Sequence, residues 1–137
     1  METTGARSLW AGPRFWILAI VLFAAASRLA NIEWDQRHFF HPDERAITYA
    51  VGRISLRPLN LDPDWFNYGS LPIYLTKITT AVLSWVDARA ASYDGVIING
   101  RRISAVAGTL TVLLTILLGA RLYGWHAGLL AGLLLAA

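Results

Sequence analysis

Four apolar stretches dominate this sequence and most constrain how it can fold. They run over residues 15–30, 71–86, 103–118 and 125–137. Hydrophobic residues make up 55% of the chain and charged residues only 15%, which is too little charge to cover the surface of a water-soluble domain. Apolar stretches of about this length are typical of helices that cross a membrane. We therefore expect an all-α, polytopic bundle with about four transmembrane helices.

The polar segments between these stretches complete the expected organisation. They are a short N-terminal segment over residues 1–14, one long loop over residues 31–70 and a connection over residues 87–102. Residues 125–137 have no polar anchor behind them, so we expect them to begin a fourth span of a longer protein. A cleaved signal peptide is the alternative for the first stretch, but the apolar stretches that follow favour an uncleaved first span.

The basic residues of the short segments predict the orientation, because such residues are retained in the cytoplasm. Two precede the first apolar stretch and three lie in the connection 87–102: Arg7, Arg14, Arg89, Arg101 and Arg102. Both segments are then cytoplasmic, and the loop 31–70 is external. We expect a multi-pass protein of the plasma membrane with its chemistry on the extracytoplasmic face.

Residues 42–57 of the long loop have the spacing of an amphipathic helix. Five apolar residues fall on one helical face: Ala46, Ile47, Ala50, Val51 and Ile54. A stripe spaced four residues apart lies beside that face: Arg45, Tyr49, Arg53 and Arg57. This pattern predicts a helix that lies flat along the membrane surface, with its apolar face turned toward the membrane or the helix bundle.

Two apolar stretches also carry residues that indicate helix packing. The stretch 71–86 is polar for a helix that faces lipid, which suggests that other helices surround it. Its polar residues are Thr76, Lys77, Thr79, Thr80 and Ser84. In the last stretch Gly124, Gly128 and Gly132 recur every four residues and would permit close approach of a neighbouring helix.

The segment from His38 to Arg45 concentrates the residues that could carry chemistry. In the simplest interpretation Pro42 opens a helix, and Asp43 and Glu44 complement the dipole of its first turn. In a second interpretation one of these carboxylates accepts a proton from a substrate hydroxyl. In a third, His38 and His41 join the carboxylates around a metal ion, although their spacing matches no recognised zinc pattern.

Two cations lie near the expected outer ends of the first and second spans, Arg28 and Lys77. Either they extend to the membrane interface, or they face a cavity and bind an anionic group such as phosphate. The aromatic residues on the same side are expected to form an interfacial belt: Trp34, Trp65, Phe66 and Tyr68. The net charge of +3 is scattered rather than clustered, so we expect no nucleic-acid partner.

The order of several short motifs resembles the N-terminal part of glycosyltransferase family 39 proteins, which are related to protein O-mannosyltransferases. The motifs are Ser27-Arg28-Leu29, HPDE at residues 41–44, FNYGSLPIYL at 66–75 and GRRISAVAGTLTVLL at 100–114. The resemblance implies a multispanning GT-C enzyme that takes a sugar from a polyprenyl-phosphate donor on the outer face. It places the family's proposed general base at Asp43, with Glu44 beside it.

The mechanism that the resemblance implies is inverting transfer of the sugar to an acceptor hydroxyl of a protein, lipid or glycan. The candidates for stabilising the departing polyprenyl phosphate are Arg28, Arg45, Lys77 and His41. No cofactor is predicted, and participation of a divalent metal stays open. Two other classes remain as alternatives: a transporter or channel subunit with Arg28 and Lys77 along its path, and a non-catalytic membrane assembly protein.

Overall fold

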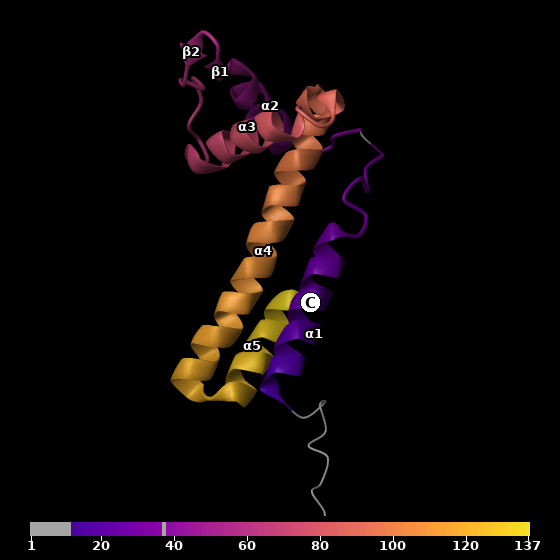
Figure 1. Cartoon of the computed structure of the whole chain (residues 1–137), viewed down its shortest axis with the longest axis vertical. Coiled ribbons are helices and arrows are strands. Elements are labelled where there is room, and N and C mark those ends of the chain that lie inside the picture. Colours follow the sequence, from indigo (N-terminus) through magenta and orange to yellow (C-terminus); the bar gives the residue numbers. More distant parts are fainter. Residues whose placement is uncertain (1–11, 37) are drawn as a thin grey trace, which may run out of the picture. The chain divides into compact units, whose positions relative to one another are not determined.

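The computed structural model describes residues 12–36 and 38–137, and most of them are helical, as predicted. The helices are α1 (Pro13–Leu29), α2 (Pro42–Arg53), α3 (Leu71–Leu83), α4 (Tyr93–Tyr123) and α5 (Trp125–Ala136) (Figure 1). A short hairpin of β1 (Ser55–Leu56) and β2 (Leu59–Asn60) follows α2, and the 3-10 helix η2 (Ala88–Ala91) precedes α4. The chain forms two compact units, one that ends at Ala30 and resumes at Ala105, and one spanning Asn31–Ser104.

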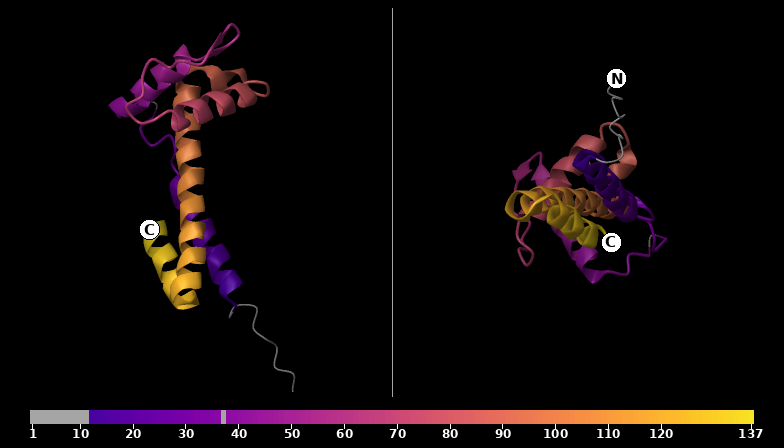
Figure 2. Two further views of the ribbon diagram at one scale, coloured as in Figure 1. Left: turned by 90° about the vertical axis from the view of Figure 1, so that its left-hand side faces the viewer. Right: turned by 90° about the horizontal axis from the view of Figure 1, so that it is seen from below.

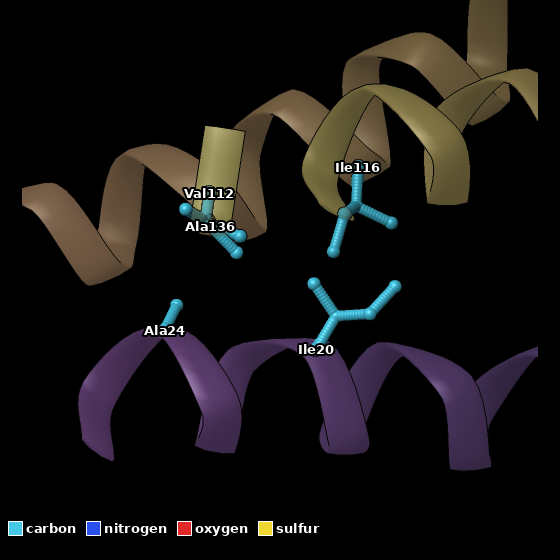
Figure 3. Close-up of a cluster of buried hydrophobic side chains, with 5 residues drawn as sticks. All are labelled: Ile20, Ala24, Val112, Ile116 and Ala136. Carbon is cyan, nitrogen blue, oxygen red and sulfur yellow. The ribbon is translucent and has the colours of Figure 1, made fainter. Parts of the chain in front are cut away.

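The first unit consists of α1, α5 and the C-terminal part of α4, with α5 folded back along α4 (Figure 2). Its core contains one cluster of buried apolar side chains, in which α1 faces the two other helices (Figure 3). The cluster comprises Ile20, Ala24, Val112, Ile116 and Ala136. Gly124 lies between α4 and α5 with a φ of 89°, a conformation that side chains with a Cβ rarely adopt, so a glycine suits this reversal.

One helix of the described residues, α4, is long and apolar enough to cross a membrane. It has 31 residues, whereas α3 and α5 are shorter apolar helices, and α1 has 17 residues. A bilayer core of about 30 Å needs roughly 20 helical residues. Of the roughly four transmembrane helices expected, only α4 among the described residues has the length and composition needed to cross a membrane.

In the second unit α2 packs its predicted apolar face against α3 and the beginning of α4. Ala50, Val51 and Ile54 are buried there together with Ile73 and Val96. The predicted face is confirmed as buried, and of the two expected coverings, membrane or helix bundle, neighbouring helices cover it. The helix ends at Arg53 rather than Arg57, in keeping with the position of Arg57 before Pro58, where helical backbone is disfavoured.

The segment expected as the second span forms a shorter helix, α3, with 13 residues. At 1.5 Å per residue a helix of this size reaches about 20 Å, less than a bilayer core. Thr76 and Thr80 are buried, and Asn99 of α4 donates hydrogen bonds to Thr79 and Thr80 over 2.8 and 2.9 Å. The polar face of α3 packs against α4, but Leu71, Ile78 and Val82 are exposed, so helices do not surround the segment as expected. Its length also does not suit a crossing.

The connection 87–102 lies with the loop 31–70 in the second unit. Helix α4 begins within it, at Tyr93. The ring of Tyr93 contacts Phe39 at 5.9 Å and Tyr49 at 6.0 Å between centroids. These contacts join the connection to the loop 31–70, and carboxylates neutralise Arg101, which the sequence interpretation treated as a free cation.

Candidate functional site

The two candidate carboxylates lie in the first turn of α2. Pro42 occupies the first helical position, and His41 at the N-cap makes no side-chain capping hydrogen bond. Asp43 and Glu44 therefore supply negative charge where the helix dipole favours it. The helix-start interpretation of the motif is correct as local structure, and it is compatible with a chemical role for either carboxylate.

Asp43 is exposed, and its carboxylate interacts with the hydroxyl of Tyr68. Hydrogen bonding to Asp43, and then its negative charge, raise the pKa of Tyr68 above its usual value, with a smaller effect of burial. Tyr68 sits in the turn before α3, where the N–H of Gly69 donates to Phe66 O over 3.1 Å and Gly69 has a φ of 76°. The turn thus brings a phenol to a carboxylate that remains open to a substrate.

Glu44, in contrast, is held by a guanidinium. Arg101 donates from Nε to Oε1 over 2.8 Å and from Nη2 to Oε2 over 2.7 Å, a bidentate pair. The same guanidinium binds Asp35, from Nη1 to Oδ1 over 3.1 Å and from Nη2 to Oδ2 over 2.6 Å. The Asp35 side chain is completely buried and that of Arg101 is only 10% exposed. Two carboxylates therefore share one cation in a largely dry site.

This group of three residues, Asp35, Glu44 and Arg101, also orders the loop that leads into α2. Arg101 Nη1 donates to Ile32 O over 2.8 Å, and Asp35 Oδ2 accepts from the backbone N–H of Phe39 over 3.1 Å. The loop and α2 are thereby tied to α4. Asp43 and Glu44 are neighbours in sequence, yet one is neutralised and enclosed while the other faces solvent.

The two histidines make aromatic contacts. His38 stacks on Phe40 with centroids 5.6 Å apart, and its Nδ1 lies 2.8 Å from Asp35 O. His41 meets the ring of Trp34 edge-on at 5.7 Å. Across residues 12–36 and 38–137, no three His, Asp or Glu side chains gather in a group that could hold a metal ion. The metal interpretation of this motif therefore gains no support.

Lys77 lines a cavity of about 520 Å³ within the second unit, formed by α2, α3, η2 and the start of α4. Its Nζ lies 3.4 Å from the carbonyl oxygen of Val51, near the end of α2. Arg53, Tyr49 and Tyr93 also line this cavity. Arg53 is paired with Asp64, so the ammonium of Lys77 beside the two phenols is what suits the cavity to an anionic group. Arg45 lies exposed on α2 and does not line it.

Arg28 belongs to the first unit, apart from the other candidates. Its guanidinium donates to three backbone carbonyls, Ala24 O over 3.2 Å, Leu135 O over 2.8 Å and Ala136 O over 3.3 Å. It also lies over Gly108, where an added Cβ would be 2.9 Å from Arg28 Nε. Arg28 thus joins α1 to α4 and α5, and its contacts are structural.

The sequence interpretation missed Asp35, Tyr68 and Arg101 as parts of this site. Arg101 carried a usable signal, since a charged residue among apolar residues in a membrane protein usually has a partner. Its partners, however, lie 57 and 66 residues earlier in the chain. No local spacing connects such distant positions.

Neither a protein-family model, nor a curated protein, nor a solved structure matches the chain. A functional proposal therefore depends on the geometry of this site and on the motifs of the sequence.

Proposed function

We propose that this chain is part of a membrane glycosyltransferase that moves a sugar from a polyprenyl phosphate to an acceptor hydroxyl, with Asp43 as general base. The observation that carries the proposal is the contrast between two adjacent carboxylates. Glu44 is fixed by Arg101, whereas Asp43 is exposed beside Tyr68. A rigid helix start that presents one accessible carboxylate suits proton abstraction from a hydroxyl.

In this mechanism Asp43 accepts the acceptor's proton as the acceptor oxygen attacks the anomeric carbon. The bond from that carbon to the phosphate oxygen breaks, its electron pair leaves with the polyprenyl phosphate, and the anomeric configuration inverts. Tyr68 holds the Asp43 carboxylate in place through its hydrogen bond. Glu44 supports the base indirectly, because its pair with Arg101 fixes the first turn of α2.

Lys77 is the cation best suited to the departing phosphate. It lines the 520 Å³ cavity near Val51, and Val51 follows Asp43 on α2 by about 12 Å at 1.5 Å per residue. Arg53 also lines the cavity, but its guanidinium is paired with Asp64. Lys77 therefore carries this role, while Arg45 and His41 stay secondary candidates. The carbonyl contacts of Arg28 argue against a phosphate role for that residue.

For the membrane arrangement, we propose that α1 and α4 cross the bilayer and that residues 31–104 lie outside the cell. Arg7 before α1 and Arg14 in its first turn support a cytoplasmic N-terminus. Because α3 is too short to cross, the connection 87–102 is external in this arrangement. The transporter alternative assigned Arg28 and Lys77 to one path, and no contact of Arg28 favours it.

The test is sugar transfer in membranes that contain the native protein, with a radiolabelled polyprenyl-phosphate sugar as donor. Asp43→Asn keeps the size of the side chain but removes its basicity, so turnover should fall by about a hundred-fold to ten-thousand-fold. Asp62→Asn, at an exposed acid in the loop after β2, is the matched control and should retain activity. Normal turnover by the Asp43→Asn protein would exclude the proposed base.

A further inference from the structure

Helix α3 presents an apolar face to the outside of the second unit. Four of its side chains point outward at the spacing of one helical face: Leu71, Leu75, Ile78 and Val82. They are between 40% and 68% exposed. Lys77, the one charged residue of α3, instead lines the cavity between α3 and α2.

The opposite, buried face of α3 holds Ile73 together with two polar residues, Thr76 and Thr80. Asn99 of α4 binds the hydroxyl of Thr80. The polar residues of this part of α3 are thus inside, while its outward face is apolar throughout. A helix on the surface of a water-soluble protein has the reverse arrangement, with apolar residues inside and polar residues outside. The outward face of α3 therefore fits an apolar medium.

We infer that α3 lies in the plane of the membrane, with this outward face in the acyl chains just below the lipid headgroups. The occupant of the face is the bilayer itself, because the chain keeps the second unit at a membrane on both sides. The unit begins directly after the apolar α1, and it ends within α4, the helix long and apolar enough to cross. With its length of about 20 Å, α3 fits along the interface rather than across it.

Exposed aromatic residues at both ends of α3 agree with this placement. Phe66 and Tyr68 precede the helix, and Trp85 follows it, 85% exposed. Aromatic side chains of this kind concentrate at the boundary between headgroups and acyl chains. The placement does not depend on sugar transfer: it sets the depth of the second unit in the membrane whatever reaction that unit supports.

The experiment uses the natural absence of cysteine from the sequence. A single cysteine is introduced at one outward position at a time and labelled with an NBD fluorophore. The four positions are Leu71, Leu75, Ile78 and Val82. Each labelled chain is reconstituted into phosphatidylcholine vesicles. Lipids with nitroxides at shallow or deep acyl positions then report the depth of each label. Matched controls at Arg57 and Asp62 place the label on exposed residues of the same unit.

An in-plane helix predicts shallow depths that agree within about 5 Å for the four labels, and no lipid quenching at the two control positions. A crossing helix would spread the depths by about 16 Å, the rise from Leu71 to Val82 at 1.5 Å per residue. That spread would overturn the inference. Quenching by aqueous iodide at the four positions would overturn it too, and so would protection from both quenchers, since a protein would then cover the face.

Discussion

Arg101 binds Glu44 through two parallel hydrogen bonds of 2.8 and 2.7 Å, and the same guanidinium holds the buried carboxylate of Asp35. One side chain of α4 thus fixes both the first turn of α2 and the loop before it. The cation offsets the desolvation of both carboxylates, because taking an ion out of water costs several kcal/mol. The arrangement makes Arg101 central to the stability of the second unit.

Replacement of Arg101 by Met should therefore lower the free energy of unfolding by about 3–5 kcal/mol, the usual cost of leaving a buried charge without its partner. Denaturant titration in detergent micelles measures this loss. Arg102→Met is the matched control, since Arg102 is exposed on the same helix, and it should change stability by no more than about 0.5 kcal/mol. Equal losses in the two variants would mean that the three-residue group adds no stability.

A second set of variants separates the lost charge pair from lost packing. In the Arg101→Met protein, Asp35→Asn should restore part of the stability, because it removes a negative charge that the missing cation no longer balances. The same Asp35→Asn change alone should destabilise the protein, because it weakens a working pair. Destabilisation by Asp35→Asn in both backgrounds would instead point to the hydrogen bond with Phe39 N–H as the dominant role of Asp35.

The parts of this structure that follow from local spacing could be predicted from the sequence. Pro42 and the repeat from Ala46 to Ile54 identified the start of α2 and its buried face. Whether residues 71–86 cross the membrane could not be predicted, because an apolar stretch of this size suits both a crossing helix and a shorter helix that packs on neighbouring helices. The contacts among Asp35, Glu44 and Arg101 could not be predicted for another reason, because these residues are distant in sequence and only the fold brings them together.

The hydrogen bond between Tyr68 and Asp43 should be visible in the titration of the phenol. Because this contact raises the pKa of Tyr68 in the folded chain, Asp43→Asn should lower that pKa toward the usual value of about 10. Its contribution to stability should be complete below about pH 10 and be lost as the pH rises through the folded-state value. Tyrosinate absorbance measures the transition, and Tyr68→Phe identifies it.

Tyr123→Phe serves as the control for this titration, because Tyr123 is 80% exposed and lies in the other unit. The transition that disappears with Tyr68→Phe should be the one that Asp43→Asn shifts. If Asp43→Asn leaves that transition unchanged, Tyr68 does not hold the proposed base.

The bonds of Asn99 should stabilise the contact between α3 and α4. Thr80→Val keeps the shape of the side chain but removes the acceptor of a buried Asn99 N–H, which should cost about 1–3 kcal/mol of unfolding free energy. Thr111→Val on α4 is the matched control, since its hydroxyl is exposed and bonds only to Ala107 O, and it should have a much smaller effect. Similar losses from the two changes would show that the buried amide finds another partner.

Replacing either of two glycines by alanine should change the free energy of unfolding, in opposite directions at the two positions. At Gly128 of α5 an added Cβ would lie 2.4 Å from Ile116 O and 2.5 Å from Ala120 N, both backbone atoms of α4 that cannot rotate away. Gly128→Ala should therefore force the helices apart and cost about 1–3 kcal/mol. At Gly52 of α2 no atom lies within 4 Å of the added Cβ, so Gly52→Ala should stabilise the chain by about 0.5–1 kcal/mol through helix propensity. Thermal unfolding of both variants compares the signs, and stabilisation by Gly128→Ala would mean that α5 does not pack closely on α4.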